Sequence, residues 1–212
     1  MNLISKVAEI YFPQGAFPIV SDLLEPHNLE IKIVKSRTTK FADFNPSDKK
    51  NKLPLITINN NLNPYSFLLT LLHEFAHYLV WKDGHLYAKP HGRTWKNHYS
   101  ELVQKTLKEE IFPENLSHLI TKHIQNPRAT SCTDINLYRK LSTFDTESAG
   151  VFIDDIPDGA YFQTRDKQIY CKEKKVRKLI LCTNHKKRKK YLFSPIYKVF
   201  PMKNQQFVIV FP

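Results

Sequence analysis

The 212-residue chain is long enough for one domain of ordinary size plus a small second unit. Its 42% hydrophobic and 25% charged residues are typical of globular proteins that fold on their own. No stretch approaches 18 uninterrupted apolar residues, and the first 17 residues lack the basic and apolar regions of a signal peptide, so we expect a cytoplasmic protein. Three widely spaced cysteines, Cys132, Cys171 and Cys182, favour reduced thiols over a disulfide framework.

The net charge of +12 is concentrated in one segment. Residues 165–203 hold 14 Lys and Arg against two acids, whereas the rest of the chain has equal numbers of basic and acidic side chains. This asymmetry indicates a neutral body that carries a basic module, and such modules usually bind phosphate-rich partners.

The first part of the chain predicts helices and strands in alternation. Residues 3–11 and 16–25 have the apolar spacing of helices, and LEIKIVKSR, from Leu29, alternates as a half-buried strand does. The polar, turn-forming KFADFNPSDKKNK, residues 40–52, predicts a hairpin or loop. LPLITIN, residues 53–59, is rich in β-branched residues and predicts a second strand.

Three helices follow. Asn63 suits an N-cap and Pro64 the first helical position, so we expect a helix from there to about Lys82. A second helix should begin after Gly92 and a third should cover residues 113–123. The first of these helices should end at Asp83-Gly84 and the third should be closed by Asn126-Pro127.

The remainder divides into a linker and a β-rich module. Residues 128–149 are rich in Ser, Thr and Asp and predict a partly ordered linker. From Val151 onward, short β-type runs alternate with turns, which indicates a small antiparallel barrel or sheet. These runs are VFIDDI, GAYFQT, QIYCK, VRKLILCT, KKYLFSP, YKVF and QFVIVF.

TLLHEFAHYLVW, residues 70–81, carries the sequence HExxH. On a helix His73 and His77 share a face and can bind one ion at about 2.0 to 2.1 Å, while Glu74 can reach a metal-bound water as a general base. A purely structural helix is the alternative interpretation. Such a helix would be expected to keep Leu or Ala at these positions, because an unpaired buried charge is costly.

A catalytic zinc site of this kind needs a third protein ligand. The metzincin pattern would require Gly at 80 and His at 83, where the chain has Val80 and Asp83. His91 is the best placed candidate, because it stands beside Gly92 at the start of the next helix. The other candidates are Glu101, His85 and His98.

LLHEFAHYL, preceded by ITINNNLNPYSFLLT and followed by PHGRTWKNHYSELV, resembles the SprT-like zinc metalloproteases. Their motif is HExxH, a short spacer, and HG with an aromatic residue three positions after the glycine. The resemblance runs from about Leu29 to Leu107. It implies one Zn²⁺ held by His73, His77 and His91, with Glu74 as the base and Trp95 as the packing aromatic.

The resemblance also implies a fold. We expect an α+β, zincin-like (minigluzincin-type) metalloprotease domain at residues 1–127, with an active-site helix and a small antiparallel sheet. A linker at 128–150 and a small C-terminal all-β module at 151–212 would follow. In zincins the strand before the active-site helix pairs with extended substrate, so residues 53–59 are expected to do so.

The family includes Spartan-type enzymes, which couple a protease to DNA binding and degrade proteins crosslinked to DNA. SprT proteins often end in a cysteine-rich zinc ribbon, but no CxxC pair is present here, so a nucleic-acid partner is predicted from charge alone. KEKKVRK and HKKRKK flank LILCT, with Tyr170, Tyr191, Phe193 and Tyr197 nearby, as in single-strand binders. A solvated charged face with the aromatics in the core is the alternative. The candidate residues are Lys172, Lys174, Lys175, Arg177, Lys178, Lys186, Lys187, Arg188, Lys189 and Lys190.

Two hypotheses follow from the sequence. The leading one is a zinc endopeptidase that acts on protein substrates, with Tyr99 or His98 as candidates for oxyanion stabilisation. The other is a non-catalytic nucleic-acid-binding or regulatory protein in which the zincin domain is structural.

Overall fold

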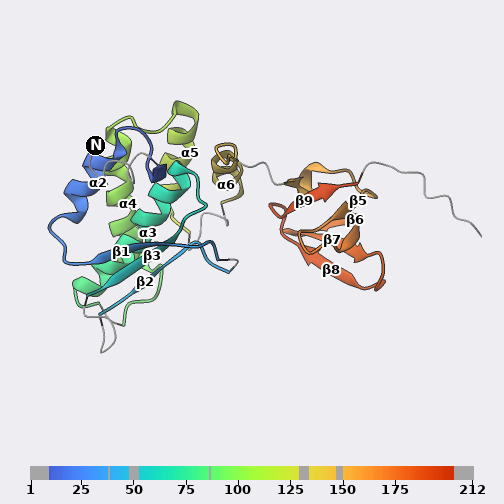
Figure 1. Cartoon of the computed structure of the whole chain (residues 1–212), viewed down its shortest axis with the longest axis horizontal. Coiled ribbons are helices and arrows are strands. Elements are labelled where there is room, and N and C mark those ends of the chain that lie inside the picture. Colours follow the sequence, from blue (N-terminus) through green and yellow to red (C-terminus); the bar gives the residue numbers. More distant parts are fainter. Residues whose placement is uncertain are drawn as a thin grey trace, which may run out of the picture. The chain divides into compact units, whose positions relative to one another are not determined.

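The computed structural model describes residues 10–37, 39–47, 53–85, 87–128, 134–146 and 150–202. The chain is α+β and divides into two compact units, residues 1–145 and 146–212 (Figure 1). The helix predicted at residues 3–11 lies mostly outside the described residues, and the strand predicted at 206–211 lies wholly outside them. In the described part of the chain, no helix has both the length and the apolar character that a membrane span requires.

Five α-helices lie wholly within the described residues of the first unit, and the three predicted between Asn63 and His123 are confirmed. α3 begins as expected, because the Asn63 side chain accepts the backbone N–H of Ser66 at 3.0 Å and Pro64 occupies the first turn. α3 packs on the sheet, and α4 packs along α3. The bounds are α2 Ala16–Leu24, α3 Pro64–Lys82, α4 Arg93–Lys108, α5 Glu114–Ile124 and α6 Ile135–Ser142.

The sheet of the first unit has three strands, β1 (Glu30–Val34), β2 (Ala42–Asn45) and β3 (Leu55–Asn59), in the order β1-β3-β2. β3 is parallel to β1 and antiparallel to β2, so the prediction of an antiparallel sheet was wrong and the sheet is mixed. β3 is also the central strand, paired on both sides. The prediction that residues 53–59 pair with substrate was therefore wrong, because their backbone groups are already bonded within the sheet.

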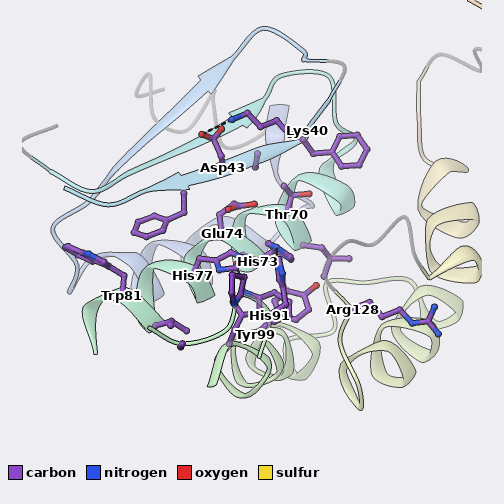
Figure 2. A pocket seen from close by; sticks show the side chains of 18 of the residues that line it. Lys40, Asp43, Thr70, His73, Glu74, His77, Trp81, His91, Tyr99 and Arg128 are labelled. Atoms are coloured by element: carbon purple, nitrogen blue, oxygen red, sulfur yellow. Dashed lines mark hydrogen bonds and ion pairs between the residues drawn. The ribbon is translucent and has the colours of Figure 1, made fainter. Parts of the chain in front are cut away.

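β2 lies inside the segment that the sequence predicted as a loop or hairpin. Its polar residue Asp43 is the centre of a bonding network, which explains why a polar stretch is held as a strand. Asp43 accepts hydrogen bonds from Arg37 and Thr57, and from Asn45 at 2.8 Å. It also pairs with Lys40 at 3.2 Å (Figure 2). Burial tends to raise the pKa of Asp43, but these hydrogen bonds outweigh it and hold that pKa well below its usual range.

α6 lies where the sequence predicted a linker at residues 128–150. Asp134 caps it by accepting the backbone N–H of Leu137 at 3.3 Å. Leu137 and Leu141 are fully buried in the core of the first unit. Two buried leucines one turn apart are sufficient to dock a short helix, so the first unit extends to Asp145.

The second unit is a six-stranded sheet in the order β4-β9-β5-β6-β7-β8. Every pairing in it is antiparallel, as the sequence predicted for this module. Cys171 and Cys182 are free thiols on neighbouring strands, and Cys132 lies outside the described residues. The strands are β4 Val151–Phe152, β5 Tyr161–Gln163, β6 Ile169–Val176, β7 Leu179–Asn184, β8 Lys190–Phe193 and β9 Lys198–Pro201, with a 3-10 turn at Ile153–Asp155.

Candidate metal centre

Three histidines meet at one point of the first unit. His73 and His77 stand one turn apart on α3, and His91 comes from the connection between α3 and α4. The Nε2 atom of His91 lies 3.1 Å from that of His73 and 3.0 Å from that of His77. His91 has a left-handed backbone, with φ of 56°, a conformation that costs free energy in a residue other than glycine. The turn that contains His91 is thus shaped to direct its ring at α3.

The arrangement fits a metal ion. All three ligand atoms lie within 4.8 Å of one another. Ligands about 2.0 to 2.1 Å from a tetrahedral zinc ion are separated from each other by about 3.3 Å, close to the distances from His91 Nε2. Where two of these ring nitrogens have no proton between them, their lone pairs repel each other. A cation bound between the nitrogens would remove that repulsion. The predicted set of three histidines is therefore brought together by the fold.

Trp95 supports the site from the first turns of α4. Its indole N–H donates to the backbone carbonyl of His73 at 3.2 Å, and its ring lies 4.6 Å from the ring of His73 and 4.7 Å from that of His91. Tyr99 stacks on the indole, with ring centres 5.0 Å apart. This packing holds the imidazoles in place, as a preorganised site requires.

The environment keeps these histidines uncharged. Burial, followed by the neighbouring histidines, lowers the pKa of His73 to about 3. Burial, followed by His91, lowers the pKa of His77 to about 4, and burial also lowers the pKa of His91. Because these pKa values are lowered, all three imidazoles are neutral at pH 7. Neutral imidazole is the form that binds metals.

Glu74 lies on the sheet-facing side of α3, between β2 and the histidines (Figure 2). Only 9% of its surface is exposed. Burial, followed by the charge of Asp43, raises the pKa of Glu74 to about 7, and a hydrogen bond from the backbone of Phe44 partly offsets this rise. A carboxyl group with this pKa can both accept and release a proton at neutral pH.

A cavity of about 980 Å³ opens beside the three histidines and Glu74. β2 lines one side of the cavity, α3 a second side, and His85 with residues 88–91 a third. His123 of α5 and Arg128 also line it. Sequence reasoning missed the contributions of β2, His123 and Arg128. The alternation of apolar and polar residues in FADFN was the one signal that favoured a strand there.

The other candidates for the third ligand lie outside the cluster. His98 pairs with Asp83 at 3.1 Å and does not line the cavity, so it is removed from both the ligand set and oxyanion stabilisation. Glu101 is exposed on α4, and His85 lines the cavity without joining the three histidines. Tyr99 is buried, which raises the pKa of its hydroxyl above the usual range and keeps it protonated.

In the second unit, most of the predicted nucleic-acid residues are exposed, but Lys172 is not. Its ammonium group is buried and donates to the carbonyl of Ile156 at 2.6 Å, with Asp158 at 3.3 Å. The prediction for Lys172 was therefore wrong, because a strand position facing the core buried this side chain. Lys175 pairs with Asp154 at 3.3 Å. Lys190 lies 3.9 Å from Glu173. The other seven predicted residues have no ion-pair partner among the described residues: Lys174, Arg177, Lys178, Lys186, Lys187, Arg188 and Lys189.

The exposed cations form two groups at opposite ends of β7, one at the β6–β7 turn and one at the β7–β8 turn. The aromatic residues between them pack on one another. Tyr170 lies 5.0 Å from Phe193 and 5.5 Å from Tyr191, ring centre to ring centre, and is buried in the core of the second unit. Tyr191 and Phe193 are partly buried and pack against that core, whereas Tyr197 is 39% exposed.

No protein-family model matches the chain, and no curated protein or solved structure is significantly similar to it. The fold and the site together define an α+β protein whose three histidines, His73, His77 and His91, lie close enough to bind a metal ion.

Proposed function

We propose that the chain is a zinc-dependent endopeptidase of SprT-like type, with a zincin-like first unit. The observation that carries this proposal is the convergence of three neutral imidazoles beside a buried carboxyl group whose pKa is about 7. The resemblance of the HExxH and HGxxW segments to SprT-like metalloproteases supports the same assignment.

In the proposed reaction, the side chains of this chain hold the ion and move a proton. His73, His77 and His91 would hold zinc through their Nε2 atoms, at the cavity that all three line. Bound zinc supplies Lewis-acid polarisation and lowers the pKa of a water ligand to about 7. The Glu74 carboxylate accepts a proton from the attacking water and then delivers it to the nitrogen of the departing amine. Burial of Glu74 favours this role, because a pKa near the working pH allows both steps.

β2 is the strand that we propose binds extended substrate, in place of β3. Phe41 accepts the backbone N–H of Asn59 at 2.8 Å, so the backbone groups of the alternate residues Ala42 and Phe44 point away from β3. The bond from Phe44 to Glu74 agrees with this direction. β2 has no strand partner on that side among the described residues and lines the cavity, so a peptide can add there by β-augmentation.

The exposed basic groups of the second unit support a nucleic-acid partner as part of the proposal. β7 has six residues, so its two ends are about 20 Å apart, a span of several phosphates of a nucleic acid. Tyr170 is buried in the core and Tyr191 and Phe193 pack against it, so contact with phosphates is favoured over base stacking. Binding should weaken steeply as salt is raised.

A cleavage assay separates this proposal from a non-catalytic, nucleic-acid-binding protein. The zinc-loaded chain is incubated with an unfolded protein and with a DNA-binding protein, each with and without single-stranded DNA, and Glu74→Gln is the control. The proposal predicts cleavage by the wild type that Glu74→Gln abolishes. Zinc binding and oligonucleotide binding with no cleavage of either substrate would instead identify the non-catalytic protein.

A further inference from the structure

A histidine distant in sequence from HExxH lines the same cavity and is bonded to an aspartate behind it. His123 stands near the end of α5 and is 4% exposed, and its Nδ1 lies 3.0 Å from a carboxylate oxygen of Asp134, which precedes α6. Its ring lies edge-on to that of Tyr99, with ring centres 6.2 Å apart, and Tyr99 lies 5.8 Å from His73. His123 thus lies one aromatic ring away from the metal ligands, on the cavity wall.

The second ring nitrogen of His123, Nε2, is reached from the cavity. In the described part of the chain, every fully enclosed side-chain nitrogen or oxygen has a hydrogen-bond partner. Asp134 bonds Nδ1, and no described residue bonds Nε2. Nε2 therefore cannot be fully enclosed, and the cavity that the ring lines is where it meets solvent or substrate.

A purely structural role explains this pair poorly. Asp134 caps α6 through its other oxygen, which accepts from Leu137, and an uncharged cap such as Asn would do the same. Apolar residues would join α5 to α6 without the desolvation cost of a buried imidazole and a carboxylate. In many enzymes a carboxylate orients a histidine through one ring nitrogen. The other ring nitrogen then faces the reaction site and can hydrogen-bond the substrate.

We infer that His123 is a catalytic residue whose Nε2–H donates a hydrogen bond to the negative oxygen that develops on the scissile carbonyl, and that Asp134 positions its ring. This inference rests on the proposed peptidase function. In this role Asp134 holds the ring through Nδ1, and Nε2–H is directed at the cavity, as the carboxylate of a catalytic triad orients its histidine. The role falls to a residue that sequence reasoning did not consider.

The test compares variants that remove one ring nitrogen at a time. His123→Asn keeps an N–H near the position of Nδ1, to donate to Asp134, and removes the group at Nε2. His123→Gln keeps an amide near the position of Nε2. Asp134→Asn retains the cap of α6 and removes the carboxylate. The matched control is His118→Asn, because His118 is an exposed histidine on the same helix and does not line the cavity.

Steady-state cleavage of a fluorogenic peptide, zinc content and melting temperature are measured for each zinc-loaded variant. We expect His123→Asn to lower kcat roughly 10²-fold or more, as does loss of one oxyanion donor, with KM changed by less than about threefold. Asp134→Asn should lower kcat less, His123→Gln should retain more activity than His123→Asn, and His118→Asn should match the wild type. Affinity for a phosphinic peptide, whose tetrahedral oxygen mimics the oxyanion, should fall in parallel with kcat/KM.

If the wild type is active and His123→Asn keeps the wild-type kcat, or changes only by a rise in KM, the inference is overturned and the peptidase proposal stands. Loss of zinc from His123→Asn would also overturn it, because the residue would then support the metal site. A wild type that cleaves no substrate would refute the peptidase proposal itself. If His123→Asn lowers the melting temperature, Asp134→Asn decides the question with the same readouts.

Discussion

Acidification should destabilise the zinc-free first unit through its buried histidines. The pKa values of His73 and His77 are about 3 and about 4 in the folded chain, against about 6.5 for a histidine in an unfolded chain. Between pH 6.5 and 4 the unfolded state therefore binds more protons than the folded state, and stability falls as pH falls. Each group contributes about 1.4 kcal/mol per pH unit.

Between pH 6.5 and pH 5 two such groups would together remove about 3 kcal/mol, because histidines of the unfolded chain are only half protonated at pH 6.5, and about 2.5 kcal/mol after a discount for the partial exposure of His77. This is a large part of a typical domain stability of about 5 to 15 kcal/mol. Above pH 6.5 both histidines are neutral in the folded and in the unfolded chain. The free energy of unfolding should therefore stop rising and level off near pH 7.

Urea unfolding of the chelator-treated chain, followed by tryptophan fluorescence, measures this effect, because both tryptophans, Trp81 and Trp95, belong to the first unit. His77→Leu should remove about half of the pH dependence, whereas the exposed control His118→Asn should leave it unchanged. Stability that is constant or higher at pH 5 than at pH 7 would refute the reasoning that these imidazoles are held neutral by the fold.

Three further predictions concern the two units. Asn63→Ala should lower the stability of the first unit by about 1 to 2 kcal/mol in the same fluorescence assay, because it removes the cap of α3; an unchanged midpoint would contradict this. Gly150→Ala should lower the melting temperature of the second unit in calorimetry far more than Gly159→Ala. Both glycines have positive φ, but only a Cβ at position 150 would lie 2.4 Å from the carbonyl oxygen of Val199. Equal shifts of the melting temperature would contradict this prediction. Replacing residues 186–189 by serines should flatten the salt dependence of oligonucleotide binding, and an unaltered slope in a salt titration would refute phosphate contact there.

The helices of the first unit were predictable because their signals are local. Asn63 and Pro64 mark the start of α3, and the spacing of His73 and His77 follows from the period of the helix that they share. The third histidine could be proposed from its place beside Gly92. Its convergence with the others, however, depends on a left-handed backbone at His91 and on the packing of Trp95, which are tertiary features.

The sheet and the far wall of the cavity were harder to predict, because their causes are distant in sequence. β2 is a strand since Arg37 and Thr57 bond Asp43 from outside it, and no local pattern in residues 40–52 reports those partners. α6 is short and polar on average, and only its docking on the core distinguishes it from a linker. His123 carried no motif, so its role emerged only when Asp134 and the cavity were placed around it.

The central claim is that one zinc ion, held by three histidines, works with the carboxyl group of Glu74. Zinc content and peptidase rate, measured on the same preparations of wild type, Glu74→Gln and His91→Ala, test it most directly. We predict one zinc per chain and cleavage for the wild type, one zinc with a rate lower by at least about 10²-fold for Glu74→Gln, and loss of both zinc and activity for His91→Ala. A wild type purified without chelator that holds no zinc, or a Glu74→Gln variant as active as the wild type, would contradict the account.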